Sequence, residues 1–108
     1  MRKLKIPMFQ VDLYIYNTSE KAAYEKNRGS LPDDWYAVHD NGHIWIGENK
    51  GMDKIGTCYH EAVHFADWVL ENRLESAFPS LRDSTELRAY MTQWAGDKVR
   101  EYVMRGEG

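Results

Sequence analysis

The chain has 108 residues, a formal net charge of −3, 43% apolar residues and a single cysteine. This length suits one domain with one modest core, and the apolar and aromatic content excludes a disordered chain. The acidic balance, with basic residues scattered along the chain, argues against nucleic-acid binding. One cysteine leaves no internal disulfide, which fits a reducing compartment such as the cytoplasm.

The N-terminal segment, residues 1–17, begins basic and then turns apolar, as a secretory signal does. Pro7 and Asp12 interrupt its apolar run, and no small-residue cleavage site follows. No stretch of the chain approaches the length of a membrane span. We therefore expect a cytoplasmic protein that does not bind a membrane.

The first part of the chain predicts a strand followed by a short helix. Residues 3–16 predict one strand, because apolar and polar side chains alternate from Val11 onward. The Asn-Thr-Ser sequence at 17–19 offers a helix cap, so a helix is expected near 19–28, ending at Gly29.

Residues 35–48 predict a β-hairpin. Two runs of β-prone residues flank Asn41 and Gly42, a pair that tolerates the positive φ of a tight turn. His39 and His43 lie on either side of this turn, and we expect them to be cross-strand partners on the surface. A contact between His43 and a substrate is the alternative.

Two longer helices are expected after the hairpin. The first runs from residue 53 to about 73, Pro79 lies in the next loop, and the second runs over about 84–103. Gly96 lowers the stability of the second helix, and close packing at that point is its expected use. The order β-α-β-β-α-α predicts a single small α+β domain over residues 1–108.

The sequence HEAVH, at residues 60–64, matches His-Glu-x-x-His on a predicted helix. His60 and His64 are four residues apart and therefore share one helix face, so both imidazoles can bind one Zn²⁺. Glu61 is one step round the helix, where it can act as a general base without binding the metal. The alternative is an ordinary solvated face that happens to carry two histidines.

The pattern around the helix separates polar from apolar side chains. At 100° per residue, the histidines share a stripe with Asp67 and Glu71, nearly opposite an apolar stripe that includes Cys58. Cys58 is therefore expected to be a buried thiol. The tryptophans Trp45, Trp68 and Trp94 are expected to lie in or beside the core.

A catalytic zinc needs a third protein ligand. Asp67 lies about 7.5 Å along the helix axis from the level of a metal shared by the histidines, beyond the reach of its side chain. Glu86, in the first turn of the last helix, is the better candidate, because an antiparallel helix could bring it across. Asp83 and Glu86 also form a capping pair, and that role stays an alternative.

HEAVHFAD, followed further along by TELRAY at 85–90, resembles the gluzincins, the zinc peptidases in which a glutamate on a following helix completes His-Glu-x-x-His. The resemblance covers residues 36–100 and is greatest to small, phage-encoded, single-domain members. It implies Zn²⁺ as cofactor, His60, His64 and Glu86 as ligands, Glu61 as catalytic base, and a peptide or protein substrate. For a phage protein the location would be the host cytoplasm.

The resemblance also bears on substrate binding. It implies that the strand HIWIG, at 43–47, is the edge strand that pairs with an extended substrate. Larger gluzincins stabilise the oxyanion with a Tyr or His from a second subdomain, for which this chain is too short. Tyr90, Tyr59 and His43 are the candidates for that role here.

The sequence thus favours a zinc metallopeptidase with a minimal gluzincin-like fold. A non-catalytic, zinc-containing or metal-free module that binds protein on a peptidase-like fold is the alternative. The short chain favours such a module, whereas the glutamate at position 61 favours the enzyme, because a binding module has no chemical need for it. A regulator that is active only with a partner protein is the third possibility.

Overall fold

Residues 3–16, predicted as one strand, form a β-hairpin in the computed structural model, which describes residues 1–6, 10–48, 53–73 and 85–105. β1 (Arg2–Ile6) pairs antiparallel with β2 (Val11–Tyr16), so that Ile6 lies opposite Val11. Gln10, just before β2, has a positive φ of 55°. The prediction of one strand is wrong because apolar residues alternate on both sides of the reversal, so the periodicity does not reveal it.

The second hairpin formed as predicted. β3 (Ala37–Asp40) and β4 (His43–Ile46) are antiparallel and joined by Asn41 and Gly42, whose φ angles are +47° and +89°. A Cβ on Gly42 would lie 3.0 Å from both the Asp12 carbonyl oxygen and the Trp68 ring. The turn therefore fits tightly between β2 and the helix that carries Trp68.

The strand order in the sheet is β1-β2-β4-β3. β2 and β4 are parallel, with Tyr14 beside His43, and the chain crosses between them through α1 and β3. The expectation that HIWIG forms the edge strand is therefore wrong: β4 is paired on both sides, and β3 lies at the edge. The reason is the long-range parallel pairing, which has no local signal in the sequence.

The helices follow the predictions closely. Asn17 and Glu20 form a capping box at η1 (Thr18–Glu20), which leads into α1 (Lys21–Arg28), and Gly29 follows with a φ of +117°. The predicted helix over 53–73 consists of α2 (Lys54–Trp68) and the π-helical turn η2 (Val69–Arg73). The last helix is α3 (Thr85–Arg105). Pro79, Asp83 and Ser84 lie outside the described residues.

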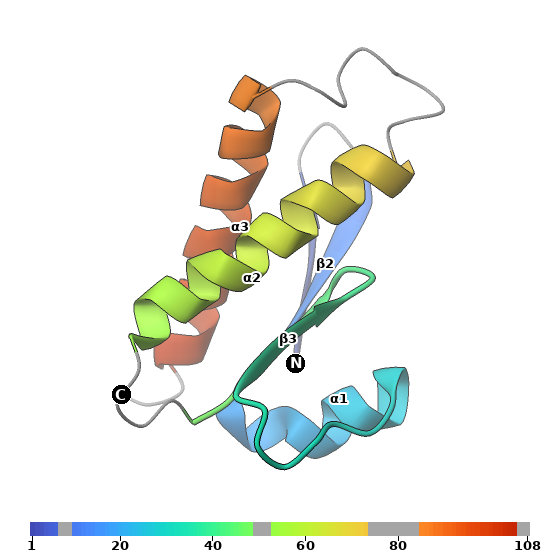
Figure 1. Ribbon diagram of the computed structural model, residues 1–108, viewed down its shortest axis with the longest axis vertical. Helices are drawn as coiled ribbons and strands as arrows, with labels where there is room; N and C mark the ends of the chain where they lie inside the picture. Colours follow the sequence, from blue (N-terminus) through green and yellow to red (C-terminus); the bar gives the residue numbers. More distant parts are fainter. Residues whose placement is uncertain (7–9, 49–52, 74–84, 106–108) are drawn as a thin grey trace.

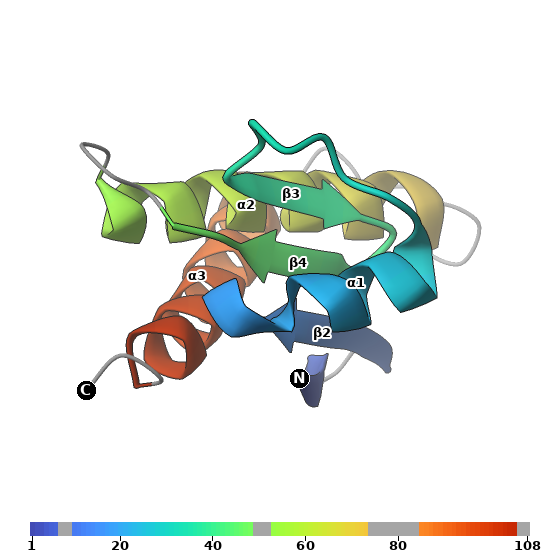
Figure 2. The same ribbon diagram turned by 90° about the horizontal axis from the view of Figure 1, so that it is seen from below.

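The domain is a small α+β fold with α1 on one face of the sheet and α2 and α3 on the other (Figures 1 and 2). Figure 2 shows α2 running beside β3, at the edge of the sheet. The main core lies between the sheet and the helices α2 and α3, and a smaller aromatic cluster of Tyr16, Tyr24, Leu31 and Trp45 lies under α1. Cys58 is fully buried, and Trp68 and Trp94 pack against the core, as predicted.

The contact between α2 and α3 depends on Gly96. A Cβ at this position would lie 2.2 Å from Cδ1 of Tyr59 on α2, so the glycine allows the close packing expected of it. The Tyr59 hydroxyl donates a hydrogen bond to Asp97, and Asp67 forms an ion pair with Arg88. Among the described residues, no helix is both long and apolar enough to cross a membrane.

Candidate functional site

The histidines of α2 converge on one point. His60 and His64 lie on its exposed face, and their Nε2 atoms are 3.3 Å apart. Two nitrogens bound to one tetrahedral zinc at 2.0–2.1 Å must lie about 3.3–3.4 Å apart, since the bond length and angle fix their separation. The described side chains therefore hold a nitrogen pair at the spacing that one zinc ion requires.

Glu61, between the two histidines in sequence, is only 7% exposed. Its carboxylate has no hydrogen-bond partner among the residues that the structure describes. Burial raises the pKa of the Glu61 carboxyl, and nearby positive charge on His60 and His64 opposes that rise. An unpaired carboxyl with a raised pKa beside a histidine pair is suited to accepting and releasing a proton.

Two hollows open between α2 and β3, one on each side of Glu61. The aromatic pocket, of about 540 Å³, is lined by Asp34, Trp35, Tyr36, Ala37, Asp53, Gly56, Thr57, His60 and Glu61. The polar hollow, of about 620 Å³, is lined by Ala37, Val38, His39, Asp40, Asn41, Glu61, His64, Asp67, Trp68, Glu71 and Asn72. Glu61 and Ala37 border both, so the buried carboxylate faces the middle of a cleft along the edge strand.

Glu86, predicted as the third metal ligand, is an exposed residue in the first turn of α3. Within the described ranges, no three His, Cys, Asp or Glu side chains are grouped closely enough to hold one metal ion. The structure therefore does not bring Glu86 to the histidine pair. Its ligand role and its capping role both stay predictions, because its capping partner, Asp83, is not described.

Asp67, the other acidic residue weighed as a ligand, reaches toward α3. Its carboxylate forms an ion pair with the Arg88 guanidinium, and both side chains are about one-third exposed. The pair connects α2 and α3, and Asp67 also lines the polar hollow. This contact gives Asp67 a structural role that does not involve a metal.

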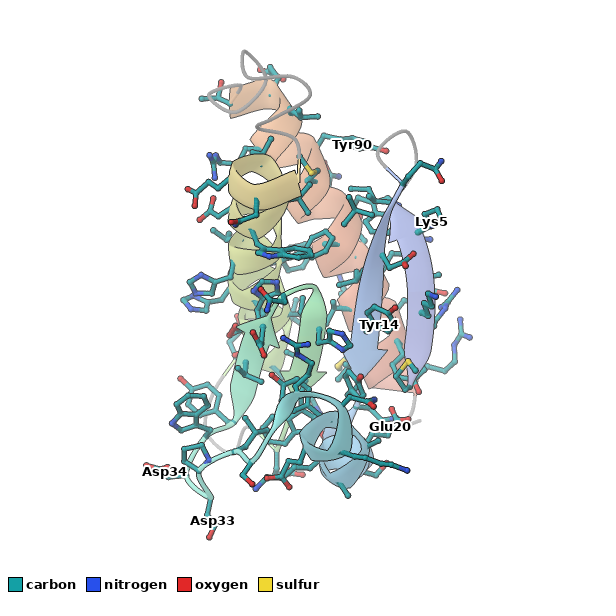
Figure 3. All side chains as sticks on the ribbon, turned by 90° about the vertical axis from the view of Figure 1, so that its right-hand side faces the viewer. Lys5, Tyr14, Glu20, Asp33, Asp34 and Tyr90 are labelled. Atoms are coloured by element: carbon teal, nitrogen blue, oxygen red, sulfur yellow. The ribbon has the colours of Figure 1, made fainter. Side chains whose placement is uncertain are left out.

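The candidate oxyanion residues do not join the histidines. His43 lies on the α1 face of the sheet, where its ring stacks on Tyr14 at 4.1 Å and its Nδ1 lies 2.9 Å from the Tyr16 hydroxyl. Figure 3 shows Tyr90 extending from α3 toward the β1–β2 side, away from α2. Tyr59 is held by its hydrogen bond to Asp97.

His39 is the residue that sequence reasoning missed. It faces α2, with its ring 6.1 Å from Phe65 and 5.9 Å from Trp68, and it lines the polar hollow together with His64. Its Nε2 accepts a hydrogen bond from the Gly42 N–H at 3.1 Å. Burial lowers the pKa of His39 to about 4, and the nearby His64 lowers it further in the same direction, so the ring is neutral at pH 7.

The expectation that His39 and His43 are cross-strand partners is wrong. The register pairs His39 with Ile44, and Asp40 with His43, so the two histidines lie on opposite faces of the sheet. The two-residue turn was the available signal, because it makes residues 40 and 43 direct neighbours and thereby places His39 on the face of Ile44.

Comparison with known proteins gives no information on the family or the function of this chain. Neither the models of known protein families, nor the curated proteins, nor the solved structures contain a match to this chain.

Proposed function

We propose that the protein is a zinc-dependent metallopeptidase that hydrolyses a peptide bond in the cleft between α2 and β3. The observation that carries the proposal is the buried Glu61 beside two histidines whose Nε2 atoms are 3.3 Å apart. Glu61 lies at the centre of an elongated cleft. Helix geometry alone brings the two rings within hydrogen-bond distance of each other on any polar face, whereas an ordinary solvated face does not bury a glutamate.

The two imidazole nitrogens are common zinc ligands at this spacing, and within the described ranges no third His, Cys, Asp or Glu joins them. Zinc held there would supply a Lewis acid that polarises a carbonyl group and lowers the pKa of a water molecule. Glu61 would accept the proton of the attacking water and then deliver it to the leaving amine.

The edge strand supports a peptide as substrate. β3 pairs with β4 on one side, and among the described residues no strand pairs with its other side. An extended peptide can add to such an edge through main-chain hydrogen bonds, which do not depend on the peptide's sequence. The hollows on either side of Glu61 would then take side chains that flank the bond being cut.

Glu86 remains the proposed third ligand, on the basis of the resemblance and of its place in the first turn of α3. Glu86→Gln removes the charge but keeps the size, and it should weaken zinc affinity by orders of magnitude in a competition titration. Asp67→Ala should cost at most the 10–100-fold typical of a residue outside the metal's ligands. Loss of zinc by Asp67→Ala with parental affinity in Glu86→Gln would contradict this ligand set.

The central test separates metal binding from catalysis. Protein purified without added zinc should contain about one equivalent, and His64→Ala should lose it. Glu61→Gln should keep the zinc and lose hydrolysis of a susceptible peptide, because an amide does not accept the proton. Glu101→Gln, an exposed site on α3, is the matched control and should behave as the parent.

Three outcomes would contradict the proposal. A zinc content below a tenth of an equivalent after reconstitution rules out the metal site. Parental hydrolysis by Glu61→Gln rules out the base. A zinc-loaded protein that binds peptides and cuts none, over a broad peptide library, is instead a non-catalytic binding module.

A further inference from the structure

We propose that the aromatic pocket is a specificity subsite for a basic side chain, arginine or lysine, next to the bond that is cut. The inference rests on the peptidase function proposed above, and it names the class of substrate that the site selects.

The walls of the pocket suit a long side chain that ends in a cation. Trp35 and Tyr36, in the connection that leads to β3, are 49% and 42% exposed, which is unusual for side chains of this size. Both line the pocket. Aromatic faces pack against aliphatic stems and attract ammonium and guanidinium groups.

Apart from His60, the ionisable side chains of the described lining are all acidic. Asp34, Asp53 and Glu61 contribute carboxyl groups from separate segments, and none of the described residues that line the pocket is Lys or Arg. Asp53 precedes α2 as its N-cap residue, yet its side chain makes no capping hydrogen bond. Its carboxylate is therefore not used by the helix beside it.

The neighbouring Asp33 provides a contrast. It lies 3.7 Å from the Lys21 Nζ, is fully exposed and does not line the pocket. Figure 3 shows the side chains of Asp33 and Asp34 diverging. Of the two adjacent aspartates, only Asp34 thus contributes its charge to the pocket.

Glu61 is the independent sign that this pocket receives a ligand. The residue is 7% exposed, it borders the pocket, and its carboxylate has no hydrogen-bond partner among the described residues. Because Glu61 also borders the polar hollow, a side chain in the aromatic pocket lies directly beside the reacting bond.

Alternative side chains fit less well. An acidic side chain would meet Asp34 and Asp53 and be repelled. A leucine or phenylalanine would contact Trp35 and Tyr36 but leave both carboxylates without a counter-charge. A basic side chain satisfies the walls and the charges together.

Binding can be measured without catalysis by NMR titration of the Trp35 indole N–H, assigned with Trp35→Phe. The probes are three acetylated tripeptide amides, Gly-Arg-Gly, Gly-Leu-Gly and Gly-Glu-Gly. The arginine peptide should bind most tightly. Asp34→Asn and Asp53→Asn should each weaken it by about two- to fivefold, the effect of a partly exposed ion pair. Neither should alter binding of the leucine peptide, and the control Asp33→Asn should leave all three unchanged.

The subsite is overturned if the leucine or glutamate peptide binds as tightly as the arginine peptide, or if the Asp34→Asn/Asp53→Asn double variant keeps parental affinity for arginine. Cleavage of a peptide library with no preference for basic residues also overturns it, while leaving the peptidase in place. Selective binding of the arginine peptide with no cleavage of any peptide supports the subsite and contradicts the peptidase, so the two failures are distinguishable.

Discussion

His39 should make the folded state sensitive to mild acid. Its pKa is lowered from 6.5 to about 4 in the folded protein, chiefly by burial. The neutral ring is therefore the stable form in the fold, whereas the unfolded chain binds a proton below pH 6.5. The stability linked to His39 is fully present above pH 6.5 and is lost as the pH falls toward 4. Linkage gives a loss of about 2.5 kcal/mol in the free energy of unfolding between pH 7.5 and 4.5.

Urea unfolding of the metal-free protein at several pH values measures this loss. The comparison is with His39→Gln, whose Oε1 can replace Nε2 as acceptor of the Gly42 N–H but does not titrate. Carboxylates and the other histidines titrate in both proteins, so the difference between the two curves isolates His39. Curves that stay parallel to within about 0.5 kcal/mol, the error of such extrapolations, would show that His39 is not buried as a neutral ring. A histidine NMR titration gives its pKa directly.

Two further predictions concern the packing of α2. Gly96→Ala should lower the melting temperature, because overpacking against Tyr59 costs about 1–3 kcal/mol and outweighs the gain of about 1 kcal/mol in helix propensity. In a Tyr59→Ala background the same substitution should raise the melting temperature. A higher melting temperature for Gly96→Ala in the parent protein would contradict the close contact. Burial raises the pKa of the Cys58 thiol to about 11, so the native protein should react with a disulfide reagent at pH 8 far more slowly than the protein in urea. Equal rates in the two conditions would show that Cys58 is accessible.

Local patterns were sufficient for much of the fold. The Asn41-Gly42 turn, the cap at Asn17 and the 3.6-residue period of α2 each depend on neighbours in sequence, and the hairpin and helices were predicted close to their observed bounds. The reversal between β1 and β2 was missed because apolar and polar residues alternate within both strands. The central position of β4 was missed because its parallel pairing with β2 joins residues far apart in the chain.

The candidate site also has some features that local sequence specifies and others that depend on tertiary packing. The convergence of His60 and His64 follows from helix geometry alone, and the structure has the spacing that geometry requires. Which side of Glu61 faces solvent, and which strand lies beside it, depends on tertiary packing. The position of Glu86 relative to the histidines depends on the path between α2 and α3, which no local pattern specifies.

The register of the hairpin formed by β3 and β4 also decides which side chains of β3 line the cleft. Side chains alternate along β3, so Ala37 and His39 face α2 while Val38 and Asp40 face away. A slip of one residue in the pairing of β3 would reverse that alternation and bring Tyr36, Val38 and Asp40 to the α2 side. The small Ala37 between the two hollows would be replaced by a larger neighbour, and a carboxylate would stand where His39 packs on Trp68. The register of this hairpin is therefore a requirement of the cleft as much as of the sheet.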